Sequence, residues 1–533
     1  MAFIPLRDIG VGGIVTDQNP YDLELSQFPT GNNVAFHDGR IGKALGYTIE
    51  KYMGESVQPV HVQAFFSSAN AVVFGTTTQL YRYDGVEQIG DDGITFTNPI
   101  TNITRLDATT QPDAIVYENY SASQRWQSSQ IGSGLIFNNG SEKPQYLADT
   151  SSNFIDLPNF PETTTNCIKP YKSFLIMAGY GNKPYTVRWS DEYAPTSYPS
   201  TWSTTDLTNL AGENTLSGNN GALIDQLTLG NTQIIYAERG VFAMDFIGAP
   251  LVFSFRELFA DDGILNRGAC AEFENKHLVV GNNDIYIHDG NQKQSVVDKR
   301  VRKTFFSEVA NKNNVFCQAI PDRSEIYICY SNDDAIDAHS CNRALVFNWS
   351  QNAFTFVDLP NIRSLTTSGV LNPTVGWDNF TGQWNAMNKN WSSATQNADA
   401  SELVVFGAAS GNRLMLMNNS YSAEGAGNNS FLEATKIDLD TVLGKATNTI
   451  KQIKGIFPQI DGNGSVDISV GVSQSPQDAI SWKTTKTYNI ETDSKVDIRA
   501  SGRYFALRIE SVNSTDNWRL TGLDIDIEEV ASR

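Results

Sequence analysis

The stretch VVFGTTTQLYRYDG, residues 72–85, has the pattern of a β-hairpin, and LVVGNNDIYIHDG, residues 278–290, repeats it. Each copy starts with strand-forming residues, passes through a turn rich in small and polar residues, and ends in an alternating run closed by Asp-Gly. In the first copy, alternation places Leu80 on one face of the strand and Tyr81 and Tyr83 on the other. The pattern therefore predicts pairs of antiparallel strands.

Similar units recur along the middle of the chain with almost no helical pattern between them. Five more begin at Gly134, Phe174, Ile234, Glu325 and Leu403. Roughly seven such units fall within the usual range of about four to eight propeller blades. The predicted fold is all-β, with an irregular β-propeller-like body built from repeated hairpins. One short helix is expected near Thr304–Ala310.

The two ends of the chain differ from this body. Residues 1–54 are expected to form an extended N-terminal segment that closes onto the propeller, which spans residues 55–430. The remainder, 431–533, reads as a separate C-terminal β-sandwich. Its last strand shows the pattern most clearly, because Leu and Ile alternate with Asp and Glu over residues 523–528, which predicts one buried and one solvent face.

Composition argues against some functions. The 533 residues carry a net charge of −20, so binding of free nucleic acid through a basic patch is disfavoured. Transient passage of DNA along the protein is compatible with this charge, because an acidic surface repels phosphates and does not trap a duplex. Solubility alone explains the negative charge equally well.

The cysteines and the lengths of the apolar runs indicate the compartment in which the chain is expected to fold. The five cysteines form no CxxC pair, which favours a reduced, cytoplasmic folding environment. The N-terminal sequence MAFIPLRDIGVGG lacks the pattern of a signal peptide. No apolar stretch approaches the ~18 residues of a membrane span, so none is expected.

Two kinds of motif resemble a metal-binding or catalytic site. Residues 461–467, DGNGSVD, place oxygen side chains at alternate positions like a calcium loop, but a hairpin turn at Asn463–Gly464 is favoured. The acidic clusters Asp261–Asp262 and Asp333–Asp334–Asp337 offer carboxylates for glycoside hydrolysis, yet they fit solvated loops better.

The histidines and serines add no chemistry. None of the five histidines has metal-ligand spacing, and His288 is expected to point outward from its strand. No GxSxG elbow marks a nucleophile. We therefore predict no catalytic residue, no metal site and no cofactor.

The densest cationic run consists of Lys299, Arg300, Arg302 and Lys303. We interpret it as a possible channel or inter-subunit contact, with a solvated helix flank as the alternative. An alternative function is a carbohydrate-binding or glycan-cleaving propeller, which would need exposed aromatic residues near carboxylates. The candidates are Trp189, Trp202, Trp349 and Trp377, although packing inside blades explains a strand Trp more simply.

Four stretches resemble one family, in chain order. They are GGIVTDQNPYDL with NNVAFHDGRIGKALGY near the N-terminus, VRWSDEYAPTSYPSTW at 187–202, the run 234–290, and GRYFALRIESVNSTDNWRLTGLDIDIEE at 502–529. Together they resemble the packaged-DNA stabilization proteins, or tail hub and nozzle proteins, of short-tailed bacteriophages.

The resemblance implies a structural virion protein without enzymatic activity, made in the host cytoplasm and located in the tail. It implies a homohexameric ring below the portal and the head-to-tail adaptor, which extends the DNA channel and helps to retain the packaged genome. The implied partners are further copies of the chain, the adaptor or connector, tail fibre, tailspike or needle proteins, and genomic DNA in transit. A receptor-binding tail tip, expected to be a trimer, is the remaining alternative.

Overall fold

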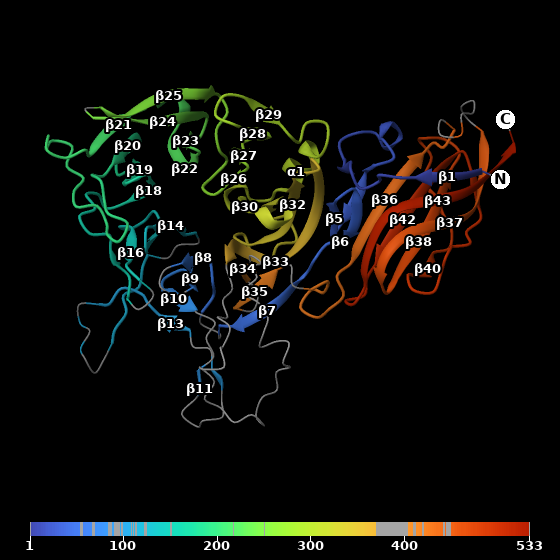
Figure 1. Ribbon diagram of the computed structural model, residues 1–533, viewed down its shortest axis with the longest axis horizontal. Helices are drawn as coiled ribbons and strands as arrows, with labels where there is room; N and C mark the ends of the chain where they lie inside the picture. The colour runs from blue at the N-terminus through green and yellow to red at the C-terminus, as the bar shows by residue number, and fades with distance from the viewer. Residues whose placement is uncertain are drawn as a thin grey trace.

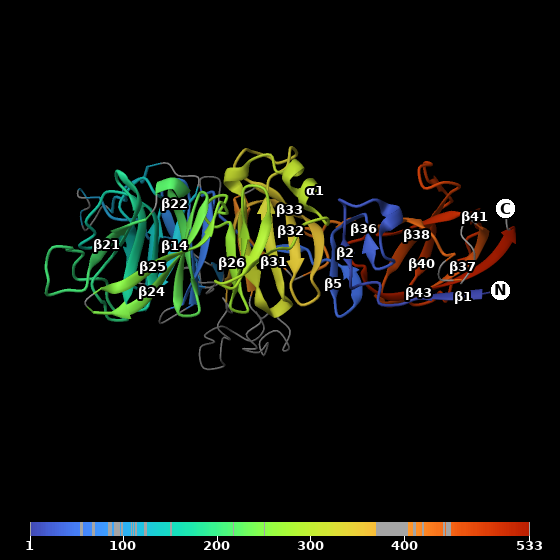
Figure 2. The same ribbon diagram turned by 90° about the horizontal axis from the view of Figure 1, so that it is seen from above.

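The chain folds into a β-propeller and a β-sandwich that lie side by side along the long axis of the molecule (Figures 1 and 2). The fold is described here from a computed structural model. It describes residues 2–53, 57–66, 70–83, 88–89, 96–97, 100–107, 109, 111, 115–121, 125–149, 152–216, 218–249, 251–368, 403–408, 412–417, 420–440, 443 and 449–531.

Five blades of the propeller are separate four-stranded antiparallel sheets, in which the strand named first lies innermost. Blade 1 has β8 (His61–Phe66), β9 (Asn70–Gly75), β10 (Leu80–Tyr83) and β13 (Thr101–Asn102). Blade 2 has β14 (Gln127–Ile131), β15 (Gly134–Asn138), β16 (Gln145–Leu147) and β17 (Ile155–Asp156). Blade 3 has β18 (Thr165–Tyr171), β19 (Phe174–Tyr180), β20 (Lys183–Trp189) and β21 (Gly212–Thr215).

Blades 4 and 5 follow the same plan. Blade 4 has β22 (Leu223–Leu229), β23 (Thr232–Ala237), β24 (Gly240–Gly248) and β25 (Val252–Ala260). Blade 5 has β26 (Cys270–Phe273), β27 (Lys276–Val280), β28 (Ile285–His288) and β29 (Lys293–Ser295).

Blades 6 and 7 share one strand. Blade 6 has β30 (Phe316–Ile320), β31 (Glu325–Tyr330), β32 (Cys341–Asn348) and the first half of β33 (Ala353–Ser368). The second half of β33 is the innermost strand of blade 7, followed by β34 (Leu403–Ala408), β35 (Arg413–Met417) and β7 (Tyr47–Tyr52). Because β7 comes from the start of the chain, it closes the ring. The expected all-β propeller with about seven hairpin units is therefore confirmed.

The blades adhere through both of their faces. In β19, Ile176 packs into a core shared with blade 4, whereas Leu175 and Met177 pack into a core shared with blade 2. Side chains alternate across a strand, so a strand covered on both faces must be apolar at every position. The same alternation places Leu80 toward blade 2 and Tyr83 toward blade 7, as the sequence predicts.

The sandwich combines the two ends of the chain. One sheet contains β41 (Ala500–Gly502), β37 (Ile450–Asn463), β43 (Asn517–Ala531), β6 (Arg40–Lys43), β5 (Val34–His37) and β1 (Ala2–Leu6). The other contains β39 (Ser481–Trp482), β40 (Lys486–Asn489), β38 (Ser465–Ser473), β42 (Tyr504–Ser511), β36 (Ser430–Ile437) and β4 (Thr30–Asn32). In β43, Leu523, Ile525 and Ile527 are buried, as expected.

The N-terminal segment does not simply close onto the propeller, as residues 1–54 were expected to do. Strands β1 and β6 pair with β43, and β4 pairs with β36, so the segment is mostly part of the sandwich. Only its last strand, β7, joins a blade. The physical reason is that β43 and β36 would otherwise present unpaired backbone edges, which the N-terminal strands cover.

Asn33 joins the two parts. It has a left-handed backbone, with φ of 52°, and its side chain is buried. Its amide nitrogen donates to Asp358 Oδ2 at 2.9 Å, and its Oδ1 accepts from the Asp358 N–H at 2.9 Å. Its own N–H donates to the Phe356 carbonyl oxygen. A single residue of the N-terminal segment is thereby fixed to the outer strand of blade 6.

The remaining elements are short. The α-helix found in the described part of the chain, α1 (Arg302–Glu308), overlaps the predicted helix. The other strands are β2 (Gly13–Ile14), β3 (Gln27–Phe28), β11 (Gln88–Ile89) and β12 (Phe96–Thr97). The 3-10 turns are η1 (Pro20–Asp22), η2 (Gly218–Asn220), η3 (Lys312–Asn314) and η4 (Pro321–Arg323).

The stretch 461–467 forms a turn, but the predicted hairpin is wrong. Strand β37 pairs with β43 in one sheet, whereas β38 pairs with β42 in the other. The chain therefore crosses between sheets at Gly464, whose φ of 92° suits glycine. The Ser465 N–H donates to Asp516 Oδ1 at 3.3 Å, which anchors this crossing.

We predict that Asn33→Ala lowers the free energy of unfolding by roughly 2–4 kcal/mol, since alanine disfavours the left-handed backbone and the Asp358 N–H loses its acceptor. Asn33→Gly is the matched control, because it keeps the backbone conformation and loses only the side-chain bonds. Urea denaturation of both variants separates the two contributions. Equal stability of Asn33→Ala and the parent would contradict the role of this joint.

Candidate functional site at the propeller axis

A polar pocket of about 300 Å³ lies at one end of the propeller axis. Its lining residues are Arg125, Asn266, Arg267, Asn313, Asn314, His339 and Arg363. In an antiparallel blade, the entry to the innermost strand and the turn between the second and third strands lie at the same end. Every lining residue comes from one of these two positions, in blades 2, 5, 6 and 7. The blade topology therefore gathers residues that are far apart in sequence.

Arg125 reaches across the axis. It precedes β14 of blade 2, and its Nη1 donates to Asn266 Oδ1 at 3.1 Å and to the Asn313 carbonyl oxygen at 2.5 Å. Its Nη2 donates to the Val315 carbonyl oxygen at 3.2 Å. Burial lowers the pKa of Arg125 to about 10, and the nearby Arg267 cation acts in the same direction. The guanidinium thus links blade 2 to blades 5 and 6.

The other two arginines are held differently. Arg267 Nη1 donates to the Asn166 carbonyl oxygen of blade 3 at 3.1 Å. Arg363 Nη2 forms an ion pair with Asp337 Oδ2 at 3.0 Å, and only 8% of its side chain is exposed. Burial alone would raise the pKa of Asp337, but hydrogen bonds from the His339 N–H and from Arg363 lower it. Asp337 is therefore ionised at neutral pH and offsets the charge of Arg363.

A buried carboxylate lies behind this pocket. Asp225 of β22 accepts from Lys169 Nζ at 3.2 Å, from the Gly268 N–H at 2.8 Å and from Cys167 Sγ at 3.3 Å. Burial opposes its ionisation, yet the Lys169 cation and the backbone donors lower the pKa of Asp225 overall. The pair is neutral as a whole and joins blades 3, 4 and 5, which indicates a structural role.

A second buried polar group links blades 4 and 5. The Tyr236 hydroxyl lies 2.7 Å from His277 Nδ1 and 2.7 Å from His288 Nε2. His277 Nε2 contacts the Thr228 carbonyl oxygen at 2.9 Å, and the Gly290 N–H donates to His288 Nδ1 at 3.2 Å. These partners assign neutral tautomers: His277 carries its proton on Nε2, and His288 carries its proton on Nε2.

His288 therefore differs from the sequence expectation. It was placed outward on its strand, but only 1% of the residue is exposed, because blade 4 covers that face. Among the described residues, no group of three or more His, Cys, Asp or Glu is placed to hold a metal ion. The five cysteines are free thiols.

The structure spreads the predicted cationic run over the start of α1 and does not gather it in the axial pocket. Arg300 donates to the Asn352 side chain and backbone at 3.0 and 2.6 Å. Arg302 pairs with Asp284 at 3.0 Å and with Asp298 at 3.2 Å. Both arginines thus hold neighbouring segments of the same chain together.

The lysines of this run are placed otherwise. Lys299 and Lys303 are exposed. The Lys299 carbonyl oxygen accepts from Gln18 Nε2 at 2.7 Å, and the Lys303 N–H donates to Asp17 Oδ2 at 2.7 Å, so their backbones bind the N-terminal segment. Of the four predicted contact residues, only these two present cationic side chains that are available to a partner.

The remaining candidates fall into loops or cores. Asp262 pairs with Lys293, and Asp261, Asp333 and Asp334 lie in loops away from the pocket lining. Trp189 and Trp202 are buried within blade cores, and Trp349 is partly buried with its Nε1 donating to Glu274. Trp377 lies outside the described residues. The aromatic platform expected of a sugar site is thus not formed by the three described tryptophans.

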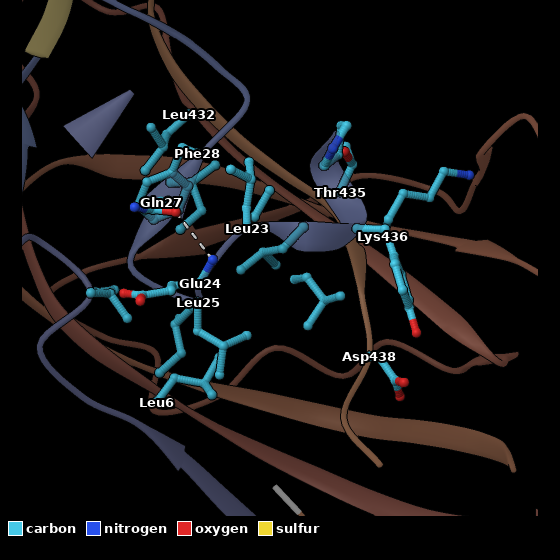
Figure 3. Close-up of a pocket in the computed structure, with 18 of the residues that line it drawn as sticks. Leu6, Leu23, Glu24, Leu25, Gln27, Phe28, Leu432, Thr435, Lys436 and Asp438 are labelled. Atoms are coloured by element: carbon cyan, nitrogen blue, oxygen red, sulfur yellow. Dashed lines mark hydrogen bonds between the residues drawn. The ribbon is translucent and has the colours of Figure 1, made fainter. Parts of the chain in front are cut away.

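A second, apolar pocket of about 370 Å³ lies between the sheets of the sandwich. Figure 3 shows Leu6, Leu23, Leu25 and Phe28 around it, and Pro20 and Tyr21 of η1 also line it. At its rim, Lys436 Nζ turns away to donate to Ser473 Oγ at 3.2 Å. This pocket therefore offers mainly apolar surface, although Glu24, Lys436 and Asp438 also line it.

The axial pocket was not found from the sequence. Arg125, Arg267 and Arg363 are isolated along the chain, and no spacing rule connects them. A usable signal is the position of Arg125 and Arg267 just before an innermost strand, as in LNRGAC at 265–270, whereas Arg363 lies within β33. That signal depends on knowing the order of strands within each blade.

Comparison with known proteins yields little. No family model matches the chain, and no curated protein matches it. Similar solved structures include the computationally designed Ika8 protein (10% identity, 70% of this chain, 99% of that chain, TM-score 0.35). U3-55K has 9% identity over 70% of this chain and 98% of its own, with a TM-score of 0.38.

A third similar structure is the extracellular domain of the one-component system BT4673 from B. thetaiotaomicron. It has 10% identity over 90% of this chain and 63% of its own, with a TM-score of 0.41. TM-scores this low support no inference about function. In the described part of the chain, no helix has the length and apolar character needed to cross a membrane.

The buried histidines predict acid sensitivity. Burial lowers the pKa of His277 to about 3 and that of His288 to about 4, so the unfolded chain binds more protons than the folded one below about pH 6.5. The free energy of unfolding should fall by roughly 4 kcal/mol between about pH 7 and about pH 5 from these two groups.

Urea denaturation at both pH values tests this. The His277→Gln/His288→Gln variant should lose less stability on acidification than the parent, because glutamine does not titrate. The exposed His339 provides the control variant, His339→Gln, which should retain the parent's pH dependence. The same acid loss in parent and double variant would contradict the assignment.

Proposed function

We propose that this protein is a structural component of the tail of a short-tailed bacteriophage, a hub or nozzle subunit. In this role it assembles as a homohexameric ring below the portal and adaptor, extends the DNA channel, helps to retain the packaged genome and anchors fibres or spikes. The proposal assigns no catalysis to the chain. It places the protein in the virion after synthesis in the host cytoplasm.

One observation carries the proposal beyond sequence resemblance. The first and last stretches that resemble the family are adjacent strands, since Gly42 of β6 pairs with Arg519 of β43 and Ile41 pairs with Leu520. The segment 234–290 runs from β23 of blade 4 to the turn after β28 of blade 5. The resemblance therefore coincides with neighbouring, paired strands in both parts of the fold, which supports a shared architecture over scattered matches.

The outer rim of blade 4 supports an assembly role. At the tip between β24 and β25, Ile247 is 54% exposed and Leu251 is 70% exposed, and Phe246 beside them is partly exposed. Neighbouring exposed apolar side chains are typical of surfaces that bind another protein. In the proposed ring, this tip is a candidate contact between subunits.

The axis of each propeller is not the proposed DNA path. Arg125 and Asn266 bond across one end of it, which obstructs a path for DNA along the axis. The proposed channel instead lies between subunits at the centre of the ring. An overall charge of −20 suits such a wall, because repulsion prevents a duplex from adhering.

The first test is the oligomeric state and the location in the particle. Native mass spectrometry should give a hexamer, and cryo-electron microscopy should place a ring on the tail axis. Leu251→Asp should shift the hexamer toward smaller species, whereas Leu207→Asp, at a lone leucine that is 98% exposed, should not. Peripheral trimers, or absence from the particle, would overturn the hub assignment in favour of a receptor-binding protein.

The exposed lysines of the cationic run give a second test. Lys299→Glu/Lys303→Glu should impair tail assembly or genome retention while leaving the thermal stability of the isolated chain unchanged, because both side chains are exposed. Particle titre and DNA content measure the effect. Arg300 and Arg302 should be left intact, since reversing their charges breaks contacts within the chain. Normal titre and DNA content would remove this run from the mechanism.

A further inference from the structure

We propose that the pocket at the propeller axis binds a small oxyanion with at least two negative charges, of the phosphate or polycarboxylate class. The inference is independent of the tail-hub proposal, because it depends only on the residues that line this pocket. It concerns a binding site within each subunit.

The chemistry of the lining favours an anion. Of its residues, Arg125, Arg267, Arg363 and His339 are basic, and the others are asparagines. Guanidinium groups donate in pairs to carboxylate and phosphate oxygens, and asparagine amides add neutral donors. Among the described residues that line the pocket, none is Asp or Glu. Such a cluster is unexpected in a chain with 59 acidic and 39 basic residues.

The charges around the pocket also favour a bound anion. Asp337 offsets Arg363 from the side, and Asp225 is held by Lys169 behind the pocket. Burial and, to a smaller extent, repulsion from the Arg267 cation lower the pKa of Arg125. Two cations held together at a partly buried position destabilise the site, and an anion between them removes that cost.

The size of the pocket restricts the ligand. A volume of about 300 Å³ is at the lower end of small-molecule sites. It admits a compact anion, whereas a nucleic-acid duplex cannot enter it. The converging donors come from four different blades, so an anion at this position also connects them. Binding should therefore raise the thermal stability of the propeller.

Isothermal titration calorimetry of the full chain at low ionic strength tests the proposal, with inorganic phosphate in one arm and citrate in the other. Saturable binding of one anion per chain is expected in at least one arm, and the arm that binds identifies the class. The same anion should raise the melting temperature. Sodium chloride at matched ionic strength controls for screening.

Variants localise the binding. Arg267→Gln should weaken the affinity about tenfold, since it removes one charge-assisted interaction. Asn313→Asp, at an exposed position, should weaken it by placing a carboxylate in the pocket. Arg256→Gln is the matched control, because that exposed arginine pairs with Asp245 on the outer strands of blade 4. Its affinity should equal that of the parent.

Three results would overturn the proposal. They are no saturable binding in either arm, equal affinity in Arg267→Gln, Asn313→Asp and the parent, and binding of an acidic peptide at this pocket while both free anions fail. Thermal melting of each variant verifies that it is folded before titration, and the two pocket variants act through different residues. A folding defect in one therefore leaves the other as the test.

Discussion

The structure depends on one constraint: strands at the edges of its sheets need backbone partners, and the N-terminal segment supplies them. Strands β1 and β6 of this segment pair with the edge of β43. Strand β4 pairs with β36, and β7 pairs with β35. Between these strands, Asn33 fixes the segment to Asp358 in blade 6. One stretch of about fifty residues thus closes the propeller, completes the sandwich and holds the two together. Exposed edges would otherwise invite pairing with other chains.

A second constraint acts at the propeller axis, where polar groups must be satisfied in a confined space. Seven innermost strands converge there, and residues that precede these strands bond across the axis, as Arg125 does with Asn266. Asp225 shows how charge is accommodated, because Lys169 and the Gly268 N–H compensate its burial. The arginine pocket at the end of the axis differs, since its basic groups exceed the carboxylates beside them. That difference motivates the inference of an anion.

The sequence predicts local features well, because they follow from side-chain alternation. Leu80 and Tyr83 face opposite neighbours as expected, and Leu523 and Ile525 lie on a buried face. Helix α1 lies near its predicted position. All of these depend on residues within one strand or one helical turn. They require no knowledge of which distant segment covers them.

Features that depend on distant partners were not predicted. The pairing of β1 with β43 joins residues more than five hundred positions apart, and strand alternation does not encode such a partner. The turn at Gly464 reads as a hairpin because the sequence does not reveal that its strands belong to different sheets. His288 is buried because of Tyr236 on the next blade. The axial pocket belongs to the same class.

The bond across the propeller axis bears on where DNA would pass in the proposed hub. If the propeller axis were open, each subunit would hold its own narrow conduit and the ring would be incidental. Because Arg125 and Asn266 bond across one end of the axis, the DNA path of the proposed ring is assigned to the space between subunits. In the proposed hub, the subunit surface beside the duplex would repel phosphate, while the apolar tip at Leu251 and the exposed lysines at 299 and 303 would contact other proteins. The proposal therefore assigns DNA contact and protein contact to different residues of the subunit.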